Sequence, residues 1–110
     1  MRLPSPENAV VDIAKLRDYC LSTGHPRGRH KARVFAASLG LSAENAEVLR
    51  EALLNAARTT EASELLTDNY GTRYNMDFLF SNESRQATVR SSWIVRRGEN
   101  FARLTSCYVL

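Results

Sequence analysis

The sequence predicts an α+β fold in which three helices precede an antiparallel sheet. Two observations carry this prediction. Apolar residues recur at helical spacing through the first half of the chain, and from Arg73 onward they recur at every second position. Segments rich in Pro, Gly, Ser and Asn separate these stretches. We expect three N-terminal helices packed on one face of a C-terminal β-meander of three or four strands.

The helical part is expected at residues 12–58, after an N-terminal arm at residues 1–11. Asp12 is a favourable N-cap for a first helix that ends near Leu21. A second helix covers 31–39, and Ser42 caps a third, which has the clearest apolar face. That face consists of Leu49, Ala52, Leu53, Ala56 and Ala57.

The sheet is expected at residues 73–110, after a polar loop at 59–69. Three strands are predicted, at 73–80, 87–95 and 104–110, and a hairpin loop at 81–84 joins the first two. One face of the sheet buries Tyr74, Met76, Phe78, Val89 and Trp93. The other face is polar and carries Arg73, Asn75, Asp77, Thr88, Arg90, Ser92, Arg103 and Thr105. It is either a plain solvent-facing surface or a binding surface, since antiparallel sheets commonly leave one face wet.

Composition indicates one globular domain over residues 1–110, with 44% hydrophobic and 25% charged residues. The net charge is +3, and thirteen of the 15 basic residues are Arg. Because Arg matches phosphate and carboxylate geometry, an anionic partner is expected. There is neither an apolar run of membrane length nor a signal peptide, so we expect no membrane association and a cytoplasmic location. Cys20 and Cys107 lack CxxC spacing, and we expect them to be buried free thiols rather than a disulfide.

Charge and titratable groups concentrate in the segment 25–33, which runs from a turn into a helix. It holds both histidines and four of the 15 basic residues. A helix N-terminus suits an anion rather than cations, so these cations are either tolerated or help to hold an anion. If this segment meets the Arg-rich sheet, the two form one cationic surface of the kind that binds nucleic acid. His25 and His30 lack a third ligand, so neither a metal nor a cofactor is expected.

Metal-independent RNA cleavage fits this set of residues, because it requires proton transfer and cations around a phosphate. The catalytic candidates are His30, Lys31, Thr105 and Tyr108. The candidates for substrate binding are His25, Arg27, Arg29, Arg33, Arg73, Arg90 and Arg103. Each also has a structural interpretation: His25 as a turn residue, His30 as a solvated residue, and Lys31 and Arg33 as side chains that cover an apolar stripe.

The chain resembles an uncharacterised bacterial family, a domain of unknown function with HPxGxxKAxxF-like and LTxxY-like motifs. The likeness rests on the segments 25–35, 39–40, 70–74, Trp93 and 103–108. A looser resemblance is to the barnase, EndoU, colicin and RelE group of ribonuclease toxins. That resemblance implies metal-independent cleavage of RNA, a neutralising partner protein, and site residues His30, Lys31, Arg33, Thr105 and Tyr108. The Glu–Arg–His trio of some members is not identifiable.

We therefore expect a ribonuclease-like toxin domain that binds RNA phosphates in a basic cleft between the second helix and the sheet. The alternative is a non-catalytic module that binds nucleic acid or a protein, such as an antitoxin-type or immunity-type interaction domain.

Overall fold

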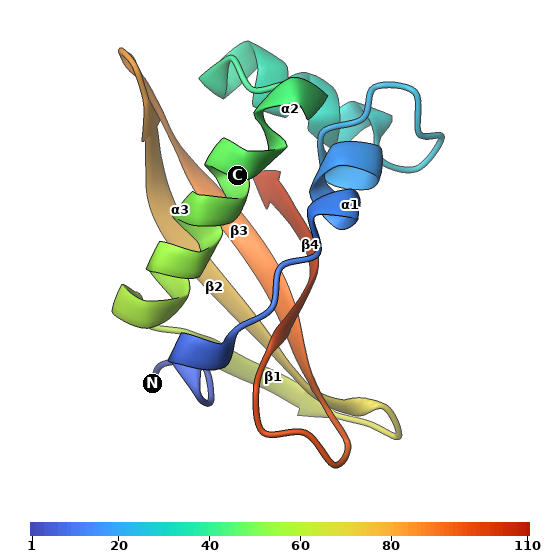
Figure 1. Ribbon diagram of the computed structural model, residues 1–110, viewed down its shortest axis with the longest axis vertical. Coiled ribbons are helices and arrows are strands. Elements are labelled where there is room, and N and C mark those ends of the chain that lie inside the picture. Colours follow the sequence, from blue (N-terminus) through green and yellow to red (C-terminus); the bar gives the residue numbers. More distant parts are fainter.

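The computed structural model describes residues 1–110 and contains three α-helices and four strands (Figure 1). A 3₁₀ turn at Pro6–Asn8 precedes α1 (Ile13–Lys15), which continues as a π-helical turn at Leu16–Cys20. Next come α2 (Arg29–Leu39), a 3₁₀ turn at Ala43–Asn45 and α3 (Ala46–Thr59). The strands are β1 (Ser63–Thr67), β2 (Gly71–Asn82), β3 (Arg85–Arg96) and β4 (Arg103–Val109).

The strands form a single antiparallel sheet in the order β1-β2-β3-β4. The helices precede the sheet in sequence and lie over one of its faces (Figure 1). The predicted α+β architecture is therefore confirmed. None of the helices combines the length and the apolar character that a membrane crossing requires.

The predicted loop at 59–69 is wrong in its central part, because β1 lies there. This strand pairs with the start of β2, at Thr72–Asn75, so the sheet begins at Ser63 rather than at Arg73. All five residues of β1 are exposed. A strand with no buried face has no hydrophobic alternation, and alternation is the signal from which strands are recognised.

The first helix differs from the expected regular helix. Asp12 caps it as predicted, since its side chain accepts a hydrogen bond from the Ala14 N–H at 3.0 Å. After Lys15, however, the helix widens into the π-turn, which buries Leu16 and Cys20. The second helix begins two residues earlier than predicted, at Arg29. The third follows a capping box formed by Ser42 and Asn45.

The core lies between the helices and the sheet. The largest fully buried side chains include Phe35, Leu39, Leu49, Leu53, Met76 and Trp93. Trp93 donates its indole N–H to the Ser91 hydroxyl at 2.8 Å, and that hydroxyl donates to the Met76 carbonyl at 2.7 Å. Its one polar atom is thus satisfied inside the core, and Trp93 is a core residue as expected.

The outer edge of β4 is partly covered by the N-terminal arm. Val10 forms a single parallel bridge with Arg103. The register between β3 and β4 shifts at Ser92/Trp93, which leaves Thr105 as the extra residue of a bulge. Bulges redirect side chains at sheet edges. Thr105 of this bulge lines a groove beside the first helix.

Candidate functional site

A groove of about 620 Å³ lies between the first helix, the turn that follows it and the bulge of β4. We call it the β4 groove. Its polar lining consists of Asp12, Lys15, Asp18, Tyr19, His25, Arg27 and Thr105. It therefore gathers two carboxylates, two cations, an imidazole and two hydroxyls. Three residues singled out from the sequence meet here, namely His25, Arg27 and Thr105.

The imidazole of His25 is held in one orientation by its own turn. Its Nδ1 accepts hydrogen bonds from the backbone N–H groups of Arg27 at 3.0 Å and Gly28 at 3.2 Å. The ring packs edge-on against Tyr19, with 4.7 Å between centroids. Because Nδ1 is an acceptor, the neutral ring carries its hydrogen on Nε2. His25 is thus oriented to donate a hydrogen bond from Nε2.

Gly28 allows this turn to lie against the first helix. A Cβ atom at this position would come 2.3 Å from the carbonyl oxygen of Tyr19. Only glycine fits such a close backbone approach. The turn, the His25 ring and Tyr19 are therefore packed as one unit.

Thr105 contributes an acceptor rather than a donor to the β4 groove. Its hydroxyl donates to the carbonyl of Ser92 at 3.0 Å, so its single hydrogen is already engaged. The lone pairs of its oxygen remain for a ligand. Of the catalytic candidates, Thr105 is the one that lines this groove.

A second contact joins the start of α2 to β4. The Nζ atom of Lys31 lies 4.8 Å from the centroid of the Tyr108 ring, within the range of a cation–π interaction. Thr105 and Tyr108 are three residues apart on β4, which is roughly 10 Å at the usual strand rise. The predicted proximity of the second helix to the final strand is therefore present, although Lys31 is half-buried while His30 is exposed.

Asp77, Arg90 and Tyr108 form a row across three strands on the outer face of the sheet. Asp77 is paired in register with Arg90, and Arg90 with Tyr108. The guanidinium of Arg90 donates two hydrogen bonds to the Asp77 carboxylate, each of 2.8 Å. The hydrogen bonds to Asp77, and then the neighbouring Tyr108 phenol, raise the pKa of Arg90, while Arg90 lowers the pKa of Asp77. Tyr108 thus lies beside a guanidinium that Asp77 holds in place.

The remaining arginines predicted on the sheet are also neutralised by carboxylates. Arg73 donates to Asp68 at 3.0 Å, and Arg103 forms a two-pronged pair with Glu99 at 3.0 and 2.9 Å. Both arginines lower the pKa of their partner carboxyl groups. The outer face of the sheet is consequently less cationic than its arginine count indicates.

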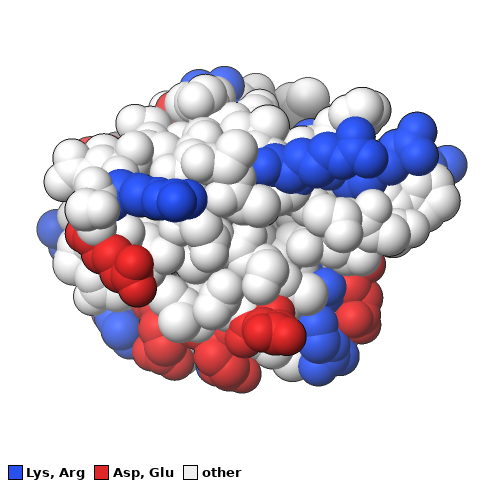
Figure 2. Space-filling view, turned by 90° about the horizontal axis from the view of Figure 1, so that it is seen from above, with Lys and Arg blue, Asp and Glu red and all other residues white.

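Five cations without an ion pair lie in the first helix, in the turn that follows it and on α2, and five more lie elsewhere, at Arg2, Arg58, Arg85, Arg96 and Arg97. Lys15, Arg27, Arg29, Lys31 and Arg33 form no salt bridge, in contrast to the paired arginines of the sheet. Arg29, His30 and Arg33 are exposed on α2. Figure 2 shows a band of Lys and Arg side chains across the upper right of the molecule, and along the lower rim Asp and Glu side chains with Lys and Arg among them. The upper-right band is thus free of carboxylates in this view, whereas the lower rim carries both charges.

The two thiols are free and in contact in the core. The Cys107 thiol and its backbone N–H hydrogen-bond to the Cys20 sulfur, which lowers the pKa of Cys20 to about 7. The same contact, together with burial, raises the pKa of Cys107. The expectation of buried free thiols is confirmed. No three His, Cys, Asp or Glu side chains are grouped as ligands of a metal ion.

Lys15 and Tyr19 line the β4 groove but were not among the residues predicted from the sequence. Their spacing of four residues places them on one side of a helix, beside the turn that carries His25. That spacing was the available signal.

The sequence matches the model of a family described as a domain of unknown function, DUF6883, over residues 2–110. The chain belongs to this family. Among proteins with curated descriptions, none matches the chain. One solved structure with a similar fold is a chain of a contact-dependent growth inhibition toxin–immunity protein complex from Klebsiella pneumoniae 342. The TM-score is 0.70 at 19% identity, covering 92% of this chain and 99% of that chain. At this identity the likeness of the DUF6883 chain to that structure is one of fold.

Proposed function

We propose that this protein is a toxin domain that cleaves RNA without a metal ion, with the RNA backbone bound along β4. The observation that carries the proposal is the convergence of hydrogen-bond donors and unpaired cations on this strand. Lys15, His25 and Arg27 lie at the bulge end, and Lys31 and Tyr108 lie at the other end. The fold it shares with a chain of a toxin–immunity complex is consistent with a toxin that has a neutralising protein partner.

The cations that converge on β4 would bind phosphate oxygens. Arg27 and Lys15 line the β4 groove, and Lys31 reaches the same strand from α2. The N–H of His25 Nε2 would donate to a phosphate oxygen, because Nδ1 is occupied by backbone donors. Donors aimed at developing charge on a phosphate lower the barrier to its cleavage.

Two further groups are suited to the two proton transfers of RNA cleavage. The Asp12 carboxylate lines the β4 groove and uses Oδ1 as the helix cap, so Oδ2 can accept the proton of the attacking 2′-hydroxyl. Asp18, by contrast, is engaged by Arg17 at 3.0 Å. Tyr108 has a free O–H with Arg90 and Lys31 beside it, and would protonate the leaving oxygen. His30 is exposed on α2 and has no role in this scheme.

The experiment is incubation of the purified protein with total RNA in EDTA. The wild type is compared with His25→Asn and with His30→Asn, which is the matched control because it changes the same residue type on an exposed site. We expect cleavage by the wild type and the His30 variant, and strong loss in the His25 variant. Intact RNA at micromolar wild-type protein contradicts the enzyme proposal. Salt-sensitive RNA binding without cleavage would instead favour the non-catalytic binding module.

A further inference from the structure

A pocket of about 450 Å³ lies where β3 ends beside the turn between β1 and β2, and we call it the arginine pocket. Three of its seven lining residues are arginines, and none is a carboxylate. Pockets of roughly 300–1,000 Å³ hold small ligands, so this one is large enough for one unit of a nucleic acid strand. Two of its arginines, Arg96 and Arg97, have no role in the proposed cleavage. The lining consists of Asn69, Tyr70, Arg73, Ile94, Arg96, Arg97 and Thr105.

The register of the sheet places the arginine pocket on the outer face. Arg73 lies opposite Ile94, and Arg96 follows Ile94 by two residues on β3, so the three side chains share one face. Gly71 lies opposite Arg96 and has no side chain to fill the space above the strands. Ile94 is only 8% exposed although it lies on this face. It therefore forms an apolar floor beneath longer, charged side chains.

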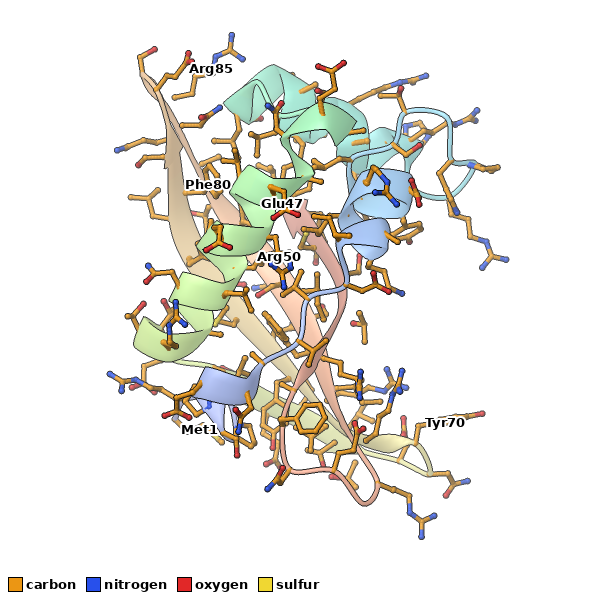
Figure 3. All side chains as sticks on the ribbon, viewed as in Figure 1. Met1, Glu47, Arg50, Tyr70, Phe80 and Arg85 are labelled. Atoms are coloured by element: carbon orange, nitrogen blue, oxygen red, sulfur yellow. The ribbon has the colours of Figure 1, made fainter.

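The turn between β1 and β2 is fixed against the end of β3. Oδ1 of Asp68 accepts hydrogen bonds from the backbone N–H groups of Tyr70 at 2.8 Å and Gly71 at 3.2 Å. The N–H of Arg97 donates to the Tyr70 carbonyl at 3.1 Å. A Cβ atom at Gly71 would overlap the carbonyl oxygen of Val95, so only glycine fits here. Figure 3 shows Tyr70 at the tip of this turn, with its side chain pointing away from the strands. The walls of the pocket are thus formed before a ligand binds.

Two positive charges of the arginine pocket are not neutralised. The charge of Arg73 is offset, because its guanidinium donates to Asp68. Arg96 and Arg97 are exposed and form no salt bridge. Glu99 follows them in the next turn, but two hydrogen bonds from the start of β4 hold its carboxylate. The excess of two guanidinium groups favours an anionic ligand, and their planar forks match the oxygens of a phosphate.

Thr105 connects the arginine pocket with the β4 groove, because its side chain lines both. A ligand in the β4 groove can therefore continue into the arginine pocket across this residue. The Thr105 hydroxyl donates to the Ser92 carbonyl, so its oxygen faces a ligand as an acceptor. The order along this path is cation, acceptor, cation. A ribose–phosphate chain offers the complementary order, in which 2′-hydroxyl donors alternate with phosphates.

We propose that the arginine pocket binds the phosphate next to the one in the β4 groove, so that a single RNA strand crosses β4 at Thr105. Arg96 and Arg97 donate to the phosphate oxygens, and Thr105 accepts from the 2′-hydroxyl between the two phosphates. The choice of RNA as ligand rests on the proposed function, but the inference concerns binding and not the cleavage step. The contacts to phosphate hold any sequence, whereas the contact to the 2′-hydroxyl distinguishes RNA from DNA.

The test of the phosphate contact uses a fluorescent single-stranded DNA of six nucleotides, which cannot be cleaved because it lacks the 2′-hydroxyl. Its affinity is measured by fluorescence anisotropy at a series of salt concentrations. In the double variant Arg96→Gln/Arg97→Gln, the slope of log affinity against log salt should fall by about 0.7 or more, the value of one phosphate contact. The control is Arg2→Gln/Arg58→Gln, which changes two exposed arginines without a salt bridge and should keep the wild-type slope. Equal slopes for the two double variants overturn the proposal.

The test of the 2′-hydroxyl contact compares RNA with DNA of the same sequence. Tyr108→Phe is present in every protein, so that the RNA stays intact. RNA should bind more tightly than DNA, Thr105→Val should make the two affinities equal, and Thr105→Ser should restore the difference. This ratio separates recognition from a structural effect, since a distorted bulge weakens both ligands. A Thr105→Val protein that keeps the full preference for RNA overturns the proposal.

Two further outcomes distinguish this inference from its alternatives. If hexaglutamate displaces the DNA from the wild type as well as RNA does, the site binds an acidic protein segment and the proposal is overturned. If the wild type binds through Arg96 and Arg97 but leaves total RNA intact, the enzyme proposal fails while the arginine pocket is supported. The two proposals therefore fail on different measurements.

Discussion

The ammonium group of Lys31 lies over the ring of Tyr108, 4.8 Å from its centroid, and joins the first turns of α2 to the last strand. The same tyrosine is paired in register with Arg90, which Asp77 holds in place from β2. One phenol is thus in contact with two cations that come from different parts of the sequence. Its free O–H is the proton donor of the proposed reaction.

Tyr108→Phe removes that hydroxyl and keeps the ring on which Lys31 packs. We expect RNA cleavage to fall by about 10²-fold or more, in the range that general acid catalysis contributes. RNA affinity should change little. Tyr70→Phe is the control, because Tyr70 is 72% exposed in a turn. A Tyr108→Phe variant that cleaves like the wild type removes Tyr108 from the mechanism.

Asp12→Asn retains an oxygen that can cap the first helix and removes the proposed base. Cleavage should drop by a similar factor while the melting temperature stays close to that of the wild type. Asp18→Asn is the control within the same groove, since its carboxylate is engaged by Arg17. Equal activity of the two variants would show that Asp12 does not accept the proton.

Gly28→Ala should destabilise the protein by about 1–3 kcal/mol or more, because its Cβ cannot fit beside the Tyr19 carbonyl without displacing backbone. The same displacement breaks the hydrogen bonds that orient His25, so RNA cleavage should also fall. Gly24→Ala is the control, since the nearest heavy atom to a Cβ there is 3.8 Å away. Urea unfolding measures the first effect, and a Gly28→Ala protein as stable as Gly24→Ala would contradict it.

Ser91→Ala should cost about 1–3 kcal/mol, the usual penalty for leaving buried partners unsatisfied. The substitution removes the acceptor of the Trp93 indole N–H and the donor to the Met76 carbonyl. Ser84→Ala, at an exposed turn position, should change the free energy of unfolding by less than about 0.5 kcal/mol. Denaturant midpoints at equal m-values compare the two, and similar midpoints would argue against the role of Ser91.

The thiol pair predicts how stability depends on pH. The folded pKa of Cys20 is about 7 and its ordinary value is 9.0, so between these values the unfolded state binds one more proton. Stability should therefore rise with pH across this window, by at most about 1.4 kcal/mol per pH unit. Above pH 9 it should fall, because the pKa of Cys107 is raised in the folded state and this thiol keeps its proton.

Cys107→Ala is the control for this pH dependence, because it removes the hydrogen-bond donor to Cys20. The difference between the two stability curves should increase from pH 7 to pH 9. The measurement is chemical unfolding at a series of pH values with reductant present. Parallel curves for the wild type and the variant would contradict the linkage.

The helices and the three long strands could be predicted because each buries one face and so has a regular apolar pattern. β1 could not be predicted, since an edge strand that is exposed throughout has no such pattern. The ion pair between Asp77 and Arg90 could not be predicted for a different reason. A four-residue hairpin loop at 81–84 would place Asp77 opposite Thr88, whereas the observed two-residue turn moves it opposite Arg90. Register depends on turn length, and composition does not reveal it.

Some residues that lie along β4 were singled out from the sequence, and their roles stay predictions. Lys31, Tyr108, Thr105 and His25 were singled out by residue type and position, and the structure brings them to one strand as two pairs. The sequence could not show whether His25 or His30 is the better site candidate, because this depends on the side of the turn on which each imidazole lies. Lys15 and Tyr19 line the β4 groove only because the first helix packs beside the bulge of β4. That tertiary contact has no signal in the local sequence.

Asp77, Arg90 and Tyr108 lie opposite one another on β2, β3 and β4, and the Asp77 carboxylate holds the guanidinium that lies beside the proposed proton donor. The register of the sheet, rather than any one segment of the sequence, therefore sets the surroundings of Tyr108. A slip of two residues between β2 and β3 would move the carboxylate away from Arg90 and leave that guanidinium without its partner.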